Sequence, residues 1–302
     1  MFGGYGLYQR ATFFGIIHKG RLYFKTNDVT QALYRARGMH PFRPGAKQTL
    51  RQYYEVPVDI LEDPQELAAV LALLDHEHTE RHAGRDFHLG ALHGQPLVLV
   101  LCGIGKVAAA ATTALLAERY GVSRIVFTGV AGGLHGNVKV GDVVLADELL
   151  QHDMDASPLF ARHVVPLTGK SRFGVDAELT RQLGQAAEAV LLDPHAAFGA
   201  EAAELGVTAP RLHRGLIISG DQFIASASAS QALRAELPDA LAVEMEGAAL
   251  AQVCHDLDLP FAVLRTVSDR ADDSAHVDFL KFVEVVAARA SAAVISHWLL
   301  AR

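Results

Sequence analysis

The chain has 302 residues, of which 50% are hydrophobic, and its formal net charge is −7 at pH 7. It therefore has enough apolar side chains to bury the core of one or two domains, while its longest apolar runs fall short of a membrane span. Two cysteines far apart in the sequence and fifteen histidines without ligand spacing argue against a disulfide framework and a metal site. The amino terminus lacks a signal-peptide pattern, so we expect a cytoplasmic protein with no membrane contact.

Residues 1–56 form a basic segment that is rich in aromatic and β-branched side chains. They hold nine Lys and Arg residues against Asp28 and Glu55, which gives this segment a charge of +7 and leaves −14 for the remainder. Such asymmetry is typical of two modules with different partners. A basic module can contact an acidic protein or a nucleic acid, although an ordinary solvated surface explains the same charge more often.

The local patterns of this segment predict a small α+β unit. A helix is predicted over residues 28–37, where Gly38 ends it. Aromatic and β-branched runs predict strands over residues 2–8, 11–17, 21–25 and 49–56.

Helical periodicity begins after Asp63. Asp63 can cap the helix, Pro64 suits its first position, and Glu66 stands three residues after the cap, so a helix is predicted that reaches about His78. The glycine-rich segment 129–133 is predicted to be a turn, where backbone either packs closely or approaches a ligand. Strands are predicted over residues 86–92, 97–101 and 125–128.

The middle of the chain alternates apolar runs with helical segments. An alanine-rich helix opens at residues 103–106 and reaches about Tyr120. Residues 151–157 are polar and predict an exposed loop, while the segment 195–211 is less regular. Further strands are predicted over 141–148 and at the start of 215–224, and further helices over 177–191 and 277–300.

Two apolar runs near the end of the chain are each followed by carboxylates. Glu244 and Glu246 follow the first run, Asp269 and Asp272 follow the second, and a helical segment lies between them. This pattern predicts a strand, a helix and a second strand. Because helix-covered parallel sheets bind ligands at the carboxyl ends of their strands, we expect Glu246 and Asp269 to lie at the heart of a site.

Seven short motifs follow one another along the chain. They are Gly103-Ile-Gly-Lys106, Thr128-Gly-Val-Ala-Gly-Gly133, Val140-Gly-Asp-Val-Val144, His152-Asp-Met-Asp155, Gly215-Leu-Ile-Ile-Ser-Gly-Asp-Gln-Phe-Ile224, Ala242-Val-Glu-Met-Glu-Gly247 and Val267-Ser-Asp-Arg-Ala-Asp272. In this order the motifs resemble the 5′-methylthioadenosine/S-adenosylhomocysteine nucleosidases of the purine nucleoside phosphorylase superfamily. The resemblance implies an α/β domain around a mixed, partly barrel-like sheet, assembled as a homodimer, that releases adenine from a 5′-thio-substituted nucleoside in methionine salvage without a cofactor.

The first segment is similar to a different family. Phe2-Gly-Gly-Tyr-Gly-Leu-Tyr8, Gly20-Arg-Leu-Tyr-Phe-Lys25 and Tyr53-Tyr-Glu-Val-Pro57 resemble the amino-terminal domain of TfoX competence regulators. That resemblance implies a regulatory or interaction module and no catalytic residue. We therefore expect a TfoX-type α+β module over residues 1–62 and a nucleosidase-like α/β domain over residues 63–302.

The nucleosidase resemblance assigns a role to each carboxylate. Asp269 matches the general acid that protonates the purine at N7, oriented by Ser268, and Glu246 matches the carboxylate that binds the ribose hydroxyls. Glu66 falls at the position of the general base, although it is equally explained as a helix-capping residue. An ordinary N-cap is the alternative for Asp269.

Other residues match the substrate pocket of the family. Arg265 matches a residue that helps to position the attacking water, and Val130 stands where many members have Ser near that water. Ordinary core packing is the alternative for Met245, Phe223 and Phe279. The remaining pocket residues are Glu244 and Met245 beside the ribose, Phe279 on the sugar and thioalkyl wall, and Phe223 with the Ile224 backbone at the adenine slot.

The sequence is compatible with two other functions. A phosphorylase would need fixed cationic donors for phosphate, and phosphorylase relatives carry Arg where this chain has Phe127. A nucleoside-sensing protein would keep the adenine pocket without catalysis. The sensor gains support because the first module replaces the opening strand of the enzyme, for which only the short residues 58–61 remain.

Overall fold

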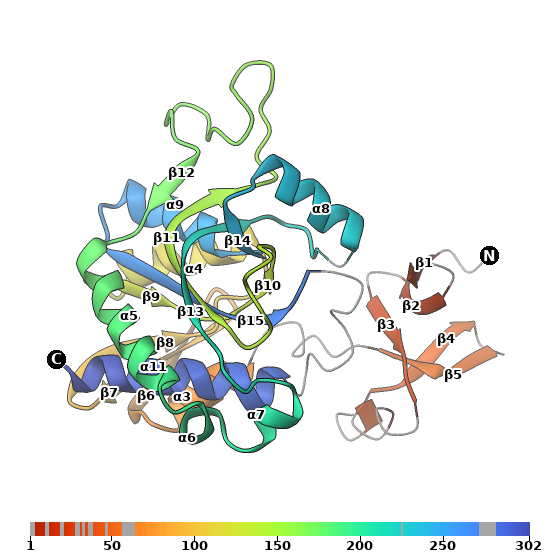
Figure 1. Ribbon diagram of the computed structural model, residues 1–302, viewed down its shortest axis with the longest axis horizontal. Helices are drawn as coiled ribbons and strands as arrows, with labels where there is room; N and C mark the ends of the chain where they lie inside the picture. The colour runs from red at the N-terminus through yellow and green to blue at the C-terminus, as the bar shows by residue number, and fades with distance from the viewer. Residues whose placement is uncertain are drawn as a thin grey trace. The chain divides into compact units, whose positions relative to one another are not determined.

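The chain forms two compact units, Met1–Glu62 and Asp63–Arg302, whose elements are labelled in Figure 1. No helix of the described residues combines the length and the hydropathy needed to cross a lipid bilayer. The computed structural model describes residues 4–9, 12–18, 21–27, 31, 34–35, 39–45, 48–55, 64–224, 226–271 and 282–302.

The first unit is built on a five-stranded antiparallel sheet in the order β1-β2-β3-β5-β4. The rings of Tyr23 and Phe42 pack with centroids 4.7 Å apart inside its core. The predicted strands are confirmed, whereas β4 was not predicted, because proline lacks a backbone donor and is unusual in strands; β4 lies at the sheet edge, where proline is tolerated. The strands are β1 (Gly4–Gln9), β2 (Thr12–His18), β3 (Arg21–Lys25), β4 (Pro41–Gly45) and β5 (Gln48–Glu55).

The second unit contains a seven-stranded mixed sheet in the order β12-β11-β13-β14-β10-β15-β9. Because β11 also pairs with β15, five of these strands close into a ring, which confirms the predicted barrel-like sheet. Its strands are β9 (Ile125–Phe127), β10 (Val130–Gly133), β11 (Val143–Gln151), β12 (Arg172–Gly174), β13 (Leu212–Ser219), β14 (Ala240–Glu244) and β15 (Phe261–Asp269).

Helices cover this sheet. Two of them, α4 (Lys106–Glu118) and α5 (Ala177–Leu191), confirm predicted helices. α9 (Gly247–Asp256) packs on α4, while α11 (Ala288–Leu300) packs on both α5 and α3 (Pro64–Leu71). The predicted start of the closing helix lies outside the described residues. The remaining helical segments are α6 (Pro194–Phe198), α7 (Glu201–Glu204), α8 (Ala227–Glu236) and the π-helical turn η1 (Val283–Ala287).

A three-stranded antiparallel sheet of β6, β7 and β8 corrects one helix prediction. Helix α3 ends at Leu71 instead of reaching His78, and β6 (Asp75–His82) begins four residues later. The polar sequence of β6 carries no apolar alternation; the strand forms because it pairs with β7 (Arg85–Leu92), which in turn pairs with β8 (Gln95–Val100). The residues that were expected to precede Glu66 as a strand lie outside the described ranges.

Two further local predictions need correction. The segment 129–133 contains strand β10 instead of a turn, and its glycines serve close packing: a Cβ at Gly132 would lie 2.9 Å from the Cβ of Ala271. The predicted exposed loop 151–157 is confirmed as a loop from His152 onward, but Gln151 ends β11, and both Gln151 and His152 are buried.

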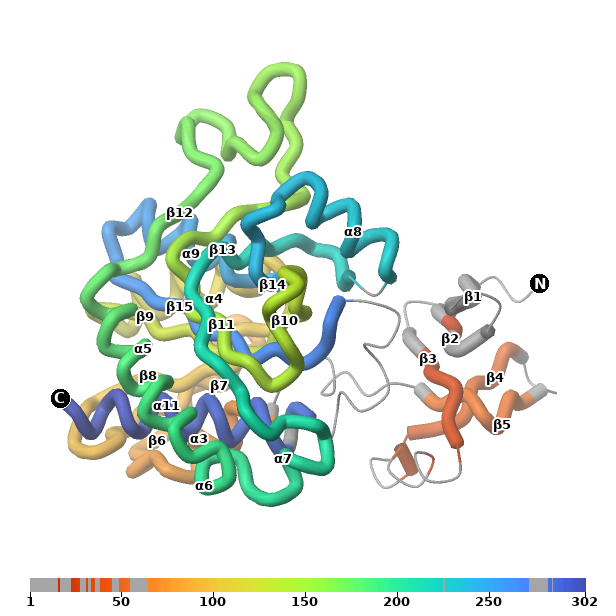
Figure 2. Tube along the Cα trace, in the orientation of Figure 1, coloured from red at the N-terminus to blue at the C-terminus, as the bar shows by residue number. Residues whose placement is uncertain are grey.

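The predicted strand, helix and strand near the chain end are confirmed as β14, α9 and β15, but their directions differ from the expectation. β10 runs parallel to β15 and antiparallel to β14, and it lies between them (Figures 1 and 2). The acids therefore do not meet at one carboxyl edge of a parallel sheet. Instead, Gly132 of β10 is in register with Val243 on one side and with Asp269 on the other.

Candidate active site

The centre of the site is a buried ion pair between Glu244, at the end of β14, and Arg265, in the middle of β15. Arg265 Nη2 donates to Glu244 Oε2 at 2.7 Å, and the two residues are 1% and 6% exposed. Ser219 Oγ and the backbone N–H groups of Glu246 and Gly247 also donate to the Glu244 carboxylate. Protein donors thus occupy both Glu244 oxygens, which makes this carboxylate an anchor for Arg265.

Arg265 lies between an aromatic ring and a glycine. Its Cζ atom is 4.0 Å from the centroid of the Phe127 ring, and a Cβ at Gly129 would lie 2.5 Å from Arg265 Nη1. The Nε and Nη1 donors of Arg265 find no partner among the described residues. Buried donors are normally satisfied, so they are suited to hold a water molecule or a polar atom of a ligand.

Glu246 stands at the start of α9 beside this ion pair. Its Oε1 accepts a hydrogen bond of 2.8 Å from the Gly105 amide at the start of α4. Burial and the negative charge of Glu244 raise the pKa of Glu246 to about 7, against the opposing influence of Arg265 and the Gly105 amide. Glu246 therefore changes its charge near neutral pH.

Asp269 ends β15 and is 8% exposed. Ser268 Oγ donates to Asp269 Oδ2 at 2.8 Å, and the Ala271 amide donates to Oδ1 at 2.7 Å. A Cβ at Gly132 would lie 3.1 Å from Asp269 Oδ1, so the missing side chain leaves that carboxylate room beside β10. Asp269 and Glu244 thus belong to the two strands that flank β10.

Glu66 comes to the same region from the first turn of α3. It is 7% exposed, and Thr128 Oγ1 donates to its Oε2 at 3.4 Å. Thr128 directly precedes Gly129, whose backbone lies against Arg265. Across 62 residues of sequence, Thr128 thus links Glu66 to the Gly129 backbone that lies against Arg265.

The remaining predicted pocket residues differ in their exposure. Ile224 packs in an apolar cluster with Ile218 and Leu233, whereas the Phe223 side chain is 58% exposed. Met245 is half-buried between the two glutamates, and Val130 is half-buried in register with Thr266. Phe279 and Asp272 lie outside the described residues.

One group of site residues was missed by the sequence analysis. The backbone N–H groups of Gly105 and Lys106, at the start of α4, donate to Glu246 Oε1 and Asp221 Oδ1, each at 2.8 Å. Lys106 Nζ also contacts Asp153 Oδ1 at 2.7 Å. The residues lie in separate motifs, and no spacing within one motif indicates that they meet.

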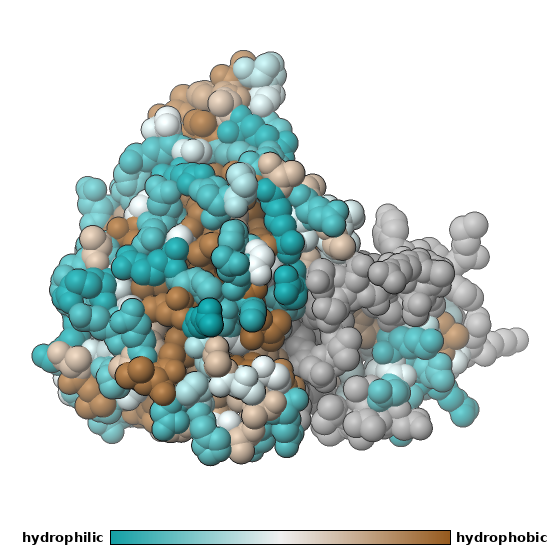
Figure 3. All heavy atoms as spheres, in the orientation of Figure 1, coloured by the Kyte–Doolittle hydropathy of each residue, from teal (hydrophilic) through white to brown (hydrophobic). Residues whose placement is uncertain are grey.

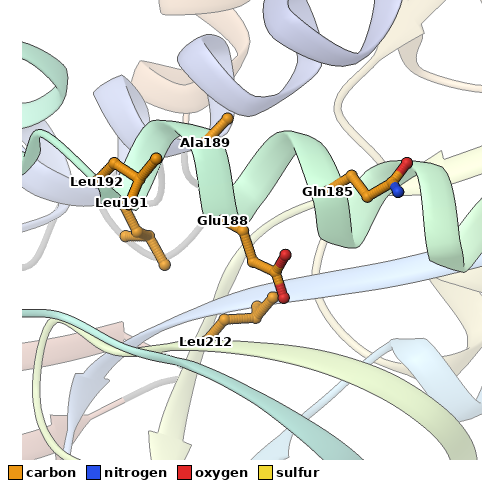
Figure 4. A pocket seen from close by; sticks show the side chains of 6 residues that line it. All are labelled: Gln185, Glu188, Ala189, Leu191, Leu192 and Leu212. Atoms are coloured by element: carbon orange, nitrogen blue, oxygen red, sulfur yellow. The ribbon is translucent and has the colours of Figure 1, made fainter.

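A groove on another face contains none of the predicted site residues. It is lined by the α5 side chains Gln185, Glu188, Ala189, Leu191 and Leu192 and by Leu212 of β13 (Figure 4). In the part of the chain that the structure describes, no three His, Cys, Asp or Glu residues are arranged to hold a metal ion.

The surface of the second unit is mostly hydrophilic in the view of Figure 3. Apolar side chains gather at the tip of the long connection between β11 and β12, where Leu159 and Leu167 are exposed. Neither this tip nor the α5 groove is in contact with the acids of the site through any hydrogen bond or ion pair of the described residues.

Comparison with known proteins matches both parts of the chain to families. Residues 59–299 match the phosphorylase superfamily, and residues 1–73 match the TfoX N-terminal domain. A 5′-methylthioadenosine/S-adenosylhomocysteine nucleosidase of Chromohalobacter salexigens is 38% identical over 74% of this chain and 88% of its own length. The nucleosidase of Mycobacterium tuberculosis is 37% identical over 74% of this chain and 89% of its own length.

Solved structures agree with this match. The crystal structure of the nucleosidase from Neisseria meningitidis, in complex with methylthio-immucillin-A, superposes with a TM-score of 0.68 at 33% identity. The superposition covers 79% of this chain and 95% of the other. The chain therefore belongs to the phosphorylase superfamily and, within it, to the 5′-methylthioadenosine/S-adenosylhomocysteine nucleosidases.

Proposed function

We propose that this protein hydrolyses the N-glycosidic bond of 5′-methylthioadenosine, S-adenosylhomocysteine or both, and releases adenine. The observation that carries the proposal is the placement of Asp269 and the Glu244–Glu246 segment on either side of β10. Cleavage of this bond puts positive charge on the sugar and negative charge on the departing base. A proton donor and an anion on neighbouring strands suit those two charges.

Asp269 supplies the proton to N7 of the base. Ser268 suits both protonation states of the carboxyl group, because its hydroxyl lies 2.8 Å from Asp269 Oδ2 and 3.4 Å from the carbonyl oxygen of Ala131. It can donate to the ionised carboxylate, or accept from the protonated one and donate to Ala131. The hydrogen bond to Asp269 is therefore kept while the proton leaves.

Glu246 binds the ribose hydroxyls, and its negative charge stabilises the oxocarbenium-like sugar. The ionised form is required for this role. Because burial and Glu244 raise the pKa of Glu246 to about 7, the free protein holds this carboxylate at the edge of ionisation. The cationic sugar of the transition state favours the ionised form of Glu246. The interaction is therefore stronger in the transition state than in the bound substrate, and this difference raises the rate.

Glu66 acts as the base that activates the attacking water, and Arg265 orients that water. Support comes from the burial of Glu66, from its contact with Thr128, and from the two buried Arg265 donors next to Gly129. Glu244 keeps Arg265 charged and fixed in the interior.

Water is favoured over phosphate as the nucleophile by the charges at the site. Arg265 is already paired with Glu244, and its guanidinium lies over the apolar ring of Phe127. The start of α4, where helix amides could hold an anion, is occupied by the carboxylates of Glu246 and Asp221. A phosphate ion would therefore meet carboxylates at the start of α4, and beside Phe127 it would meet an arginine whose charge Glu244 already balances.

Adenine release from methylthioadenosine in phosphate-free buffer tests the proposal. Turnover without phosphate supports hydrolysis, whereas turnover only after phosphate is added assigns a phosphorylase. Tight binding of a non-hydrolysable analogue without any turnover would instead assign a nucleoside sensor.

We also propose that residues 1–62 and 63–302 are separate domains of a cytoplasmic homodimer. The division of the chain into two compact units supports the boundary, although the two family matches overlap over residues 59–73. The +7 charge of residues 1–56 supports contact of the first domain with an acidic protein or a nucleic acid. Limited proteolysis and sedimentation measure the boundary and the assembly.

A further inference from the structure

Three segments that are distant in sequence are tied together at the start of α4. Lys106 Nζ binds Asp153 Oδ1 at 2.7 Å in the loop that follows β11, and the Asp221 amide donates to Asp153 Oδ2 at 2.9 Å. The Lys106 amide in turn donates to Asp221 Oδ1 at 2.8 Å. We call Lys106, Asp153 and Asp221 the clasp.

The clasp holds the first residues of the loop 220–224, which carries Phe223 and Ile224. The same loop is fixed at its base by His152, whose amide donates to the Ser219 carbonyl at 2.9 Å. A Cβ at Gly220 would collide with His152 Nε2, so the backbone is pressed against that ring. The position of the loop therefore depends on the segment 152–153 as well as on its own strand.

The clasp also connects this loop to the carboxylate proposed to bind the sugar. Gly105, the residue before Lys106, donates its amide to Glu246 Oε1. One end of α4 thus holds both the loop with the base-slot residues and the Glu246 side chain.

We propose that Lys106 and Asp153 are positioning residues that hold the loop 220–224 at the distance from Glu246 that an adenine nucleoside requires. This inference rests on the proposed function of the site. Neither side chain acts on the reacting atoms directly; both act through the loop and through the start of α4.

The charges and burial of the pair suit such a role. The side chains of Lys106 and Asp153 are 17% and 19% exposed, so solvent screens their attraction less than that of a surface pair. Burial raises the pKa of Asp153, but hydrogen bonds from Lys106 and the Asp221 amide outweigh it and hold the pKa below its usual value. Asp153 therefore stays ionised across the neutral range.

Removal of the clasp is expected to weaken binding more than it slows chemistry. Asp269 and Ser268 belong to β15 and keep their hydrogen bonds when the loop shifts, whereas the base slot loses its fixed position. Lys106→Met and Asp153→Asn should each raise the KM for methylthioadenosine about tenfold and change kcat less than about threefold. Because the two residues act as one pair, the KM of the double variant should be about the same as that of either single variant.

The experiment measures kcat, KM and thermal unfolding for Lys106→Met, Asp153→Asn, the double variant and Lys106→Arg. Lys106→Arg retains the charge and should recover most of the wild-type KM. Asp239→Asn is the matched control, because Arg172 Nη1 and Asp239 Oδ2 form an ion pair of the same 2.7 Å length away from the clasp. Equilibrium binding of adenine, followed by calorimetry, gives a second readout that requires no turnover.

Wild-type KM and wild-type adenine affinity in both single variants, with only a lower unfolding temperature, would overturn the inference. An equal rise in KM for Asp239→Asn would also overturn it, because the effect would then be general destabilisation. If Lys106→Met does not fold, Asp153→Asn, which keeps the side-chain volume, decides the matter. Failure of the wild-type protein to release adenine would count against the proposed function, while adenine affinity would still test the clasp.

Discussion

At the scale of single residues, the site depends on carboxylates that differ in what surrounds them. Glu244 is saturated by protein donors and an arginine, whereas Glu246 accepts from the Gly105 amide and has the charge of Glu244 beside it. Asp269 is bound by a serine hydroxyl and a backbone amide. Identical chemical groups can therefore take the proposed roles of anchor, sugar ligand and acid, because different donors and charges surround them.

Asp269→Asn tests the acid. The amide keeps the size of the side chain and cannot donate the proton that the leaving base requires, so kcat should fall by at least about 10²-fold while the unfolding temperature changes little. Stopped or continuous assays of adenine release give the rate, and circular dichroism gives the fold. Undiminished turnover in this variant would remove Asp269 from the mechanism.

The pH dependence of kcat/KM tests Glu246. Its pKa in the free protein is raised to about 7 by burial and by Glu244, and only the ionised form stabilises the cationic sugar. Activity should therefore fall as the pH drops below 7, with an apparent pKa near that value, because kcat/KM reports groups of the free enzyme. A profile that stays flat from pH 8 down to pH 5.5 would contradict this assignment.

Glu66→Gln tests the base. Gln retains the size and one acceptor for Thr128 but cannot take a proton from water, so kcat should fall roughly 10²-fold with little change in KM. Thr128→Val serves as the comparison, because it removes the contact and leaves the Glu66 carboxylate in place. A Glu66→Gln variant that hydrolyses as fast as the parent would show that the base lies elsewhere.

At the scale of elements, the sequence pattern predicted those helices and strands whose formation depends on their own residues. α5 follows from its own periodicity and from Asp176, whose side chain accepts from the Leu179 amide. β6 could not be predicted, because a strand of Asp, His, Glu, Thr and Arg without any apolar residue forms only when β7 pairs with it. β10 was hidden by its glycines, which permit close packing against β15 and do not mark a turn.

Gly132→Ala tests the role of β10 between the two sets of acids. A Cβ there would lie 2.9 Å from the Ala271 Cβ and 3.1 Å from Asp269 Oδ1, so the added methyl group must shift Ala271 and crowd the acid. Overpacking of this kind costs about 1–3 kcal/mol, and kcat should fall together with the unfolding temperature. Gly136→Ala is the control, since a Cβ at Gly136 has open space around it; equal effects of the two substitutions would refute the packing argument.

At the scale of the whole molecule, the sequence predicted the acids of the site but not how they meet. The motifs placed Glu244, Glu246 and Asp269 at strand ends, and those strands exist. Their opposite directions depend on β10, which enters between them from more than 100 residues earlier in the chain. The pairing of Glu244 with Arg265 and the clasp likewise depend on tertiary geometry, for which no short motif carries a signal.

The buried position of Glu246 should make the stability of the whole protein depend on pH. Its pKa lies near 4.5 ordinarily and about 7 in the fold, so the folded state binds the proton more tightly than the unfolded state. The stability that this proton provides is complete below pH 4.5 and is lost as the pH rises through 7. By linkage, the loss in the free energy of unfolding reaches about 3 kcal/mol.

The variant Glu246→Gln tests this loss, because its side chain cannot ionise and so avoids it. The unfolding temperature of the variant, relative to that of the parent, should therefore be several degrees higher at pH 8 than at pH 5. Functional residues often lower the stability of a protein in this way. An equal difference between the two proteins at both pH values would mean that Glu246 is not held in a surrounding that disfavours its charge.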